Sequence, residues 1–205
     1  VSEIFIENNL KHLLFSVGIH YEYDAIHLND IQPALSDGPY WKKGDIFLSI
    51  NNQAMIMLYR PKTSEIIEII YGPFSHHHDV DIISDHEISI YNNNVYNTHQ
   101  EKNNEVLIYN FKNKKFKKKF NKSLIKLDVF SDGQALSEID KINNTLFIEE
   151  TETGRALFFD KNGQIKWQYF NRANNGQMYT LNLSRLITDE KFIKIIKDNL
   201  KDIKC

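Results

Sequence analysis

The chain has 205 residues, of which 41% are hydrophobic and 25% charged, a composition that supports a sizeable core and excludes a wholly disordered protein. The 25 basic and 27 acidic residues leave a formal charge of −2, which argues against a polyanion-binding protein held by net charge. The single cysteine, Cys205, is the last residue, so an intramolecular disulfide and a thiolate zinc cage are excluded, and no apolar run is long enough for a membrane span.

A repeated pattern of short apolar runs organises the chain. A short run ending in an aromatic residue, a polar turn and a second run recur around Tyr59, Tyr109 and Phe159, at a spacing of 50 residues. A degenerate copy, EIFIENNLKHLLF, lies around Phe5. Each copy predicts a β-hairpin, and another pair of strand-like runs precedes each of the last three copies. Four short strands in each unit of about 50 residues are typical of a propeller blade.

The sequence therefore predicts an all-β fold: a partial, open β-propeller of three to four four-stranded blades over residues 1–187. A β-sandwich is the rival fold, but it does not require a fixed repeat. Three full blades and a remnant do not close a ring of the usual four to eight blades. We therefore expect this chain to be the C-terminal part of a longer protein whose further blades lie upstream, or an arc that another chain completes.

A helix is predicted at the C-terminal end, over residues 188–205, packed on the propeller or capping it. Helical spacing puts Phe192, Ile195, Ile196, Leu200 and Ile203 on one face, and acidic residues occupy the first turn after Thr188.

Seven lysines lie in the run from Lys112 to Lys122, which suggests a nucleic-acid site. The run coincides with an outer hairpin, where lysines protect a sheet edge from pairing, and the rest of the chain is not basic. We therefore expect an edge strand and no nucleic-acid partner.

The chain has 21 lysines but few arginines, so each arginine merits attention. The arginines are Arg60, Arg155, Arg172 and Arg185.

Two histidine-containing motifs lie at equivalent blade positions. HLND (residues 27–30) and HHHD (residues 76–79) both begin the first strand of a blade, which in a propeller is innermost and lines the central channel. A metal site is the alternative reading of the tandem histidines, but strand alternation sends His77 to the opposite face from its two neighbours. We therefore expect no bound metal.

At these motifs the sequence resembles the arylsulfotransferase-type propeller family, in the order and spacing of several segments between Ile26 and Tyr169. The segments are HLNDIQPAL, GDIFLSINNQAMIMLYRP, GPFSHHHDVDII, ISIYNNN and GQALSEIDKINNTLFIEETETGRALFFDKNGQIKWQY. The resemblance implies a six-bladed propeller, usually periplasmic. It also implies transfer of a sulfuryl group from an aryl sulfate to a phenol through a sulfated histidine, with no nucleotide cofactor.

The family motifs map onto individual residues of this chain. The His-x-Asn motif falls on His27, the expected acid/base, and Asn29, an expected substrate contact. The Gln-His-Asp motif falls on His77, His78 and Asp79, so the resemblance makes His78 the nucleophile and His77 a substrate contact. Where the family has a sulfate-binding arginine, this chain has Asn51 or Asn52, and we take Asn51 as the replacement.

The chemistry explains these residue types. A neutral imidazole is a competent nucleophile near pH 7, and a second imidazole can exchange the phenol's proton. Asparagine donates weaker hydrogen bonds to sulfate than arginine does. Two hypotheses therefore stay open: an arylsulfotransferase-like enzyme, or a propeller that binds a ligand or partner without turnover. His27, Asn29 and His78 favour the first hypothesis, and the missing arginine favours the second.

Overall fold

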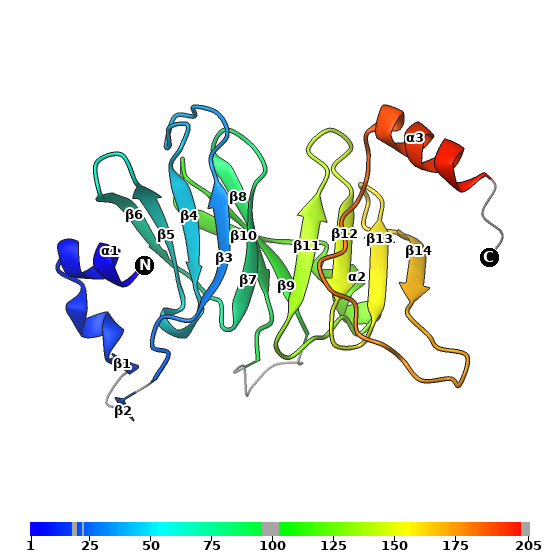
Figure 1. Ribbon diagram of the computed structural model, residues 1–205, viewed down its shortest axis with the longest axis horizontal. Coiled ribbons are helices and arrows are strands. Elements are labelled where there is room, and N and C mark those ends of the chain that lie inside the picture. The colour runs from blue at the N-terminus through cyan, green and yellow to red at the C-terminus, as the bar shows by residue number, and fades with distance from the viewer. Residues whose placement is uncertain (18–19, 22, 96–102, 202–205) are drawn as a thin grey trace.

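Three four-stranded antiparallel sheets follow one another along the chain in the computed structural model, which describes residues 1–17, 20–21, 23–95 and 103–201 (Figure 1). Each sheet is a meander in which consecutive strands pair. The first sheet is β3 (Leu28–Pro33), β4 (Ile46–Ile50), β5 (Met55–Arg60) and β6 (Glu65–Tyr71). The second is β7 (His77–Ile82), β8 (Glu87–Asn92), β9 (Glu105–Asn110) and β10 (Lys115–Lys119). The third is β11 (Ala135–Ile139), β12 (Leu146–Glu150), β13 (Arg155–Phe159) and β14 (Ile165–Phe170).

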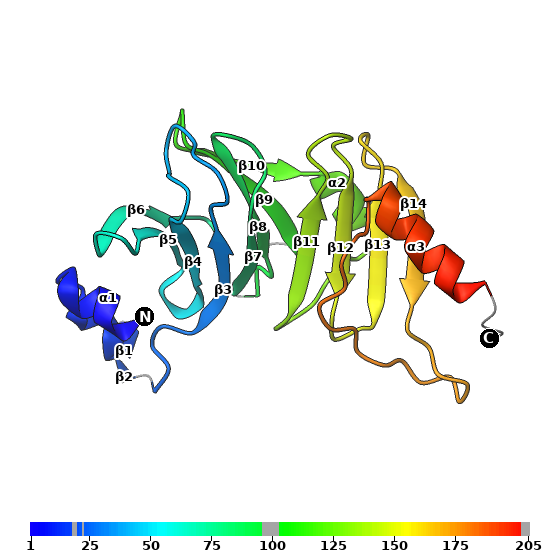
Figure 2. The same ribbon diagram turned by 45° about the horizontal axis from the view of Figure 1, so that its top comes forward.

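The three sheets are arranged as the blades of an open propeller. Their first strands lie innermost: β7 contacts β3 on one side and β11 on the other, while β6, β10 and β14 form the outer edges (Figures 1 and 2). The predicted propeller architecture and its four strands per blade are therefore confirmed.

The core lies between neighbouring blades. Phe47, Ile56 and Leu58 of the first blade are buried against Ile88 and Leu107 of the second. A second buried cluster joins the second and third blades. Its members are Tyr91, Val106, Ile108, Leu124, Val129, Ala135, Ile139, Leu146, Ile148, Leu157 and Phe159. Both faces of the middle blade are thus covered, which explains why its two central strands, β8 and β9, are buried along almost their whole length.

The N-terminal segment does not form the predicted hairpin. It folds as helix α1 (Ser2–Glu7) and a 3-10 helix, η1 (Lys11–Leu14), followed by the short strand pair β1 (Ser16–Val17) and β2 (His20–Tyr21). Phe5 is fully buried against the outward face of the first blade. The arc therefore has three blades, and a helical cap takes the place of the degenerate fourth copy.

The lysine-rich run occupies an outer edge, as predicted. Strand β10 is the last strand of the second blade, and two of its lysines pair with glutamates of β8 and β9. Lys117 Nζ lies 2.8 Å from Glu87 Oε1. Lys114, in the preceding turn, binds Glu68 of the first blade and so joins the outer rims of two blades.

The C-terminal segment crosses the open face of the third blade. This strap, residues 179–187, begins where Tyr179 N donates to Asn171 O (2.8 Å) and Leu181 N to Thr151 O (3.0 Å). It passes so close to Gly154 that a Cβ there would lie 1.9 Å from Tyr179 O, and Gly154 also has a left-handed backbone (φ 67°).

Helix α3 (Glu190–Leu200) follows the strap, as predicted for the C-terminal end. Its N-cap Asp189 accepts a hydrogen bond from Phe192 N (2.7 Å). Figure 1 shows the helix above β13 and β14 of the third blade, and its apolar residues Phe192, Ile195 and Leu200 are about half exposed.

Two aspartate carboxylates connect the inner strands of consecutive blades through hydrogen bonds from backbone N–H groups. Asp30 Oδ2 on β3 accepts from Val80 N on β7 (2.9 Å), and Asp79 Oδ2 on β7 accepts from Ser137 N on β11 (2.7 Å). The two aspartates are the last residues of the two related motifs. The repeat thus places one acceptor in β3 and one in β7, and each accepts from the inner strand of the next blade.

Replacing Asp79 with alanine is expected to lower the free energy of unfolding by roughly 1–3 kcal/mol, because Ser137 N loses its acceptor in a buried place. Asp79→Asn, which keeps an acceptor oxygen, is expected to cost less. Urea unfolding followed by tryptophan fluorescence measures both variants. Equal losses in the two variants would show that the carboxyl group matters through something other than this hydrogen bond.

Candidate active site

The same left-handed turn precedes β3 and β7. His27 (φ 45°) and His76 (φ 51°) occupy equivalent positions and are among the few non-glycine residues with positive φ. The carbonyl of His27 accepts from Asn51 N (3.0 Å), and that of His76 accepts from Asn93 N (3.3 Å). The repeat therefore fixes how both motifs enter the inner strands.

A direct contact joins the two motifs. Asn29 Nδ2 lies 2.9 Å from His77 O and 3.0 Å from His78 Nε2. A carbonyl oxygen only accepts, so the contact with His77 O identifies the amide nitrogen of Asn29 as the donor. Nε2 of His78 is then the acceptor and carries the lone pair, and the proton of the neutral ring is on Nδ1.

Burial keeps His78 neutral. It lowers the pKa of His78 to about 4, with smaller contributions from nearby His27 and His76. The side chain is nevertheless only partly buried. At pH 7 the ring is therefore an accessible neutral imidazole, the form in which histidine can act as a nucleophile.

A cavity of about 300 Å³ opens beside this pair. Asn29 and His78 line it with polar groups of all three blades and of the strap. These further polar residues are Asp30, Asp79, Gln134, Glu149, Thr151, Asn182 and Arg185. The cavity could hold a small polar group such as sulfate against the His78 imidazole.

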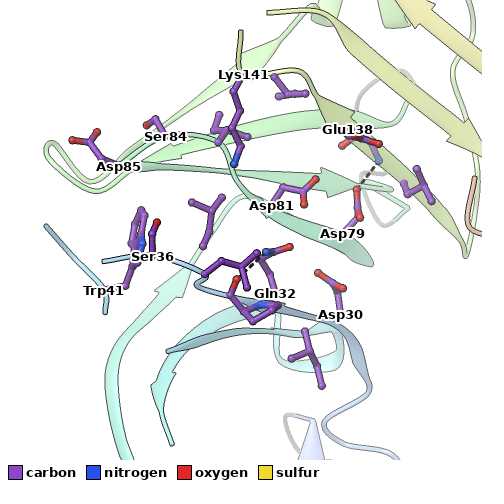
Figure 3. Close-up of a pocket in the computed structure, with 18 of the residues that line it drawn as sticks. Asp30, Gln32, Ser36, Trp41, Asp79, Asp81, Ser84, Asp85, Glu138 and Lys141 are labelled. Atoms are coloured by element: carbon purple, nitrogen blue, oxygen red, sulfur yellow. Dashed lines mark hydrogen bonds between the residues drawn. The ribbon is translucent and has the colours of Figure 1, made fainter. Parts of the chain in front are cut away.

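A larger acidic cavity, of about 630 Å³, adjoins the first and shares Asp30, Asp79 and Arg185 with it. Figure 3 shows Asp30, Asp79 and Asp81 around the same space, with Lys141 reaching toward it. Burial raises the pKa of Asp79 well above its usual range and that of Asp81 to about 6, and neighbouring carboxylates add to both shifts. Within the ranges that the structure describes, no group of three or more His, Cys, Asp or Glu side chains is arranged to hold a metal ion.

His27 lies outside the smaller cavity but close enough to affect the pKa of His78. Asp24 Oδ2 is 2.7 Å from His27 Nδ1, and Asp24 Oδ1 accepts from His27 N (2.9 Å). These hydrogen bonds lower the pKa of Asp24, so its carboxylate is ionised and requires a proton on Nδ1 of His27. Nε2 of His27 is the ring nitrogen that Asp24 does not contact.

Two of the predicted substrate contacts lie in the interior. His77 is fully buried with its ring 4.3 Å from that of Phe74, and its Nε2 lies 3.2 Å from Met55 O. Asn51 is 6% exposed in the turn after β4. Neither residue lines either cavity, so the structure brings together Asn29 and His78, with His27 nearby, and places His77 and Asn51 in packing positions.

Neither Asp24 nor Arg185 was predicted to have a role in the site. Asp24 lies three residues before His27, a spacing typical of a side chain that accepts a backbone N–H in a turn, and this signal could have identified it. The only signal in the sequence for Arg185 is that arginine is rare in a chain with 21 lysines. Its place in the fold depends on the strap, whose path no local pattern predicts.

In the portion of the chain that is described, none of the helices has the length and apolar character needed to cross a bilayer.

An open arc of four-stranded blades, with a histidine and an asparagine meeting at the inner strands, defines a propeller-class protein with a candidate site on its channel side. The arylsulfotransferase (ASST) family model matches residues 1–172. The chain therefore belongs to the arylsulfotransferase family, as its motifs indicated.

Solved structures give weaker similarities. One is a functionally unknown protein from Desulfotomaculum acetoxidans (13% identity, TM-score 0.45, 70% of this chain and 42% of that one). Another is apo AztD from Citrobacter koseri (7% identity, TM-score 0.40, 71% of this chain and 35% of that one). A third is virginiamycin B lyase from Staphylococcus aureus (15% identity, TM-score 0.39, 68% of this chain and 44% of that one). The chain spans less than half the length of each. No curated protein sequence matches the chain significantly.

The tautomer and pKa of His78 can be measured by ¹⁵N NMR. The ring is expected to carry its proton on Nδ1 and to titrate near pH 4. In Asn29→Asp the carboxylate accepts instead of donating, so the proton is expected to move to Nε2 and the pKa of His78 to rise. An unchanged tautomer in this variant would contradict the assigned hydrogen bond.

His77 is expected to make the fold sensitive to acid. Burial lowers its pKa to about 4 from an ordinary 6.5, so between these values the unfolded chain binds a proton that the folded chain does not. Stability is therefore complete above pH 6.5 and falls as the pH falls toward 4, by about 3 kcal/mol from this residue. In His77→Phe the difference in unfolding free energy between pH 7 and pH 4 should shrink by about that amount. An identical pH dependence in the two proteins would refute this assignment.

Proposed function

We propose that this protein transfers a sulfuryl group from an aryl sulfate to a phenol through a covalent intermediate on His78. The contact of Asn29 Nδ2 with His78 Nε2 at the wall of a cavity is the observation that carries the proposal. It provides a neutral imidazole with a defined lone pair beside a neutral donor. Membership of the arylsulfotransferase family supports aryl sulfates as the substrate class.

In the first half-reaction the lone pair of His78 Nε2 attacks the sulfur of the aryl sulfate. The N–S bond forms as the bond from sulfur to the aryl oxygen breaks, and the phenolate leaves with the electron pair. The proton on Nδ1 of His78 stays in place. Attack requires Asn29 to release Nε2, and its N–H is then available to a sulfate oxygen, where developing charge needs a fixed donor.

In the second half-reaction a phenol oxygen attacks the same sulfur. The S–O bond forms, the N–S bond breaks, and the electron pair returns to His78 Nε2. The phenol's proton passes to Nε2 of His27, which Asp24 leaves free by binding Nδ1. Asp24 is thus a positioning residue in this scheme. The scheme needs no nucleotide cofactor.

A binding protein without turnover is the second candidate, and the placement of position 51 favours it. The family's sulfate-binding arginine is replaced by Asn51, which is buried away from the cavity and cannot take over that contact from its position.

The proposal is tested by transfer from a chromogenic aryl sulfate to a phenol, catalysed by the intact protein. His78→Ala is expected to lower the rate by at least about a thousandfold, because no other group in the scheme carries the sulfuryl group. His86→Ala is the matched control, since His86 lies in a loop and pairs with Asp85; it should leave the rate unchanged.

The covalent intermediate gives an independent readout. Rapid quenching with the aryl sulfate alone should trap a sulfuryl group on the wild type and on His86→Ala, and none on His78→Ala. Aryl sulfate binding without release of phenol, in the wild type and in His78→Ala alike, would instead establish the binding protein.

A further inference from the structure

We propose that Arg185, carried by the strap, is the cationic residue that binds the sulfate group of the substrate; this inference rests on the proposed function. Arg185 lines the same cavity as His78 and Asn29. It comes from the segment after the last blade, far in sequence from position 51, where the family has its arginine.

The strap holds Arg185 in place from both sides. Ser184 N donates to Glu149 Oε2 (2.6 Å) and Leu186 N donates to Glu138 Oε2 (3.1 Å). Glu149 is fully buried and also accepts from Thr151 Oγ1 (2.9 Å). Leu186 packs against the apolar cluster of the third blade. The two residues that flank Arg185 are therefore anchored to the third blade.

The guanidinium of Arg185 has donors available for a ligand. Its hydrogen bond is from Nη1 to Ser184 O (3.1 Å), and no carboxylate of the described residues lies within 4 Å of it. By contrast, Arg60 binds Asp45 through two nitrogens, and Arg155 binds Glu150 and two backbone carbonyls. Those two arginines have structural roles, whereas Arg185 can present a fork of N–H groups to an anion.

The nearby carboxylates do not cancel this charge by direct pairing. Asp30 and Asp79 each accept a backbone N–H from the next blade. Burial raises the pKa of both, so each is ionised less readily than an exposed aspartate. Arg185 acts on them at longer range, and its N–H groups remain available to sulfate.

The reaction scheme needs a cation at this place. Sulfuryl transfer spreads negative charge over the oxygens of sulfur, and the neutral amide of Asn29 alone stabilises that charge weakly. An arginine in the same cavity supplies the charge-assisted contacts that Asn51 cannot. The substrate class that follows is a sulfate monoester whose anionic end enters the cavity and whose aryl group lies outside it.

Calorimetric titration of the intact protein with inorganic sulfate, and then with phenyl sulfate, tests the inference. Arg185→Ala is expected to weaken binding of both anions roughly 10- to 100-fold, and Arg185→Lys to weaken it less. Arg172→Ala is the matched control, because Arg172 lines a separate cavity and should leave binding unchanged. Arg185 is exposed, so folding of each variant, checked by circular dichroism and thermal unfolding, should be preserved.

The outcomes separate the two proposals. Unchanged anion affinity in Arg185→Ala would overturn the role of Arg185, whether or not the protein transfers sulfuryl groups. Anion binding that depends on Arg185 but is accompanied by no transfer would uphold the anion site and overturn the proposed reaction. Added guanidinium should restore part of the affinity in Arg185→Ala and have no such effect in Arg172→Ala. An absence of rescue together with unfolding of the variant would show a structural role and would also overturn the inference.

Discussion

The bond between an aspartate on one inner strand and a backbone N–H on the next is the constraint on which the rest of the structure depends. Asp30 joins β3 to β7 and Asp79 joins β7 to β11, so each bond connects the innermost strands of two consecutive blades. The apolar clusters fill the wedge that these bonds define. The same bond at Asp30 brings its neighbour Asn29 against His78. Architecture and candidate site therefore share one set of contacts.

The blades were predictable because two signals agree: short apolar runs separated by polar turns, and a repeat of 50 residues. The prediction failed at EIFIENNLKHLLF, where the same run of apolar residues forms a helix. By periodicity alone, a short apolar run fits a strand as well as a helix. Here the packing of Phe5 against the first blade accompanies the helical structure. The C-terminal helix, with its acidic first turn and N-cap Asp189, was predictable from local signals.

The site was predictable only in part. Asn29 and His78 were found because the repeat places them at equivalent positions of neighbouring blades. His77 precedes His78 in the same motif and Asn51 lies in the 3-10 turn after β4, yet both are buried, because strand alternation and that turn direct them inward. Arg185 could not be placed, since it reaches the cavity through backbone bonds to Glu138 and Glu149, which lie 48 and 35 residues from their partners.

The strap follows all three blades in the chain, so it is synthesised after them. A nascent chain that has emerged as far as residue 172 holds all three blades and the entire family match, yet Glu138 and Glu149 still lack the backbone donors that the strap brings. The third blade then exposes an apolar face and two acidic side chains to the surroundings. Residues 181–186 supply both the backbone donors and the apolar cover, so the lining of the cavity is complete only when these residues are in place.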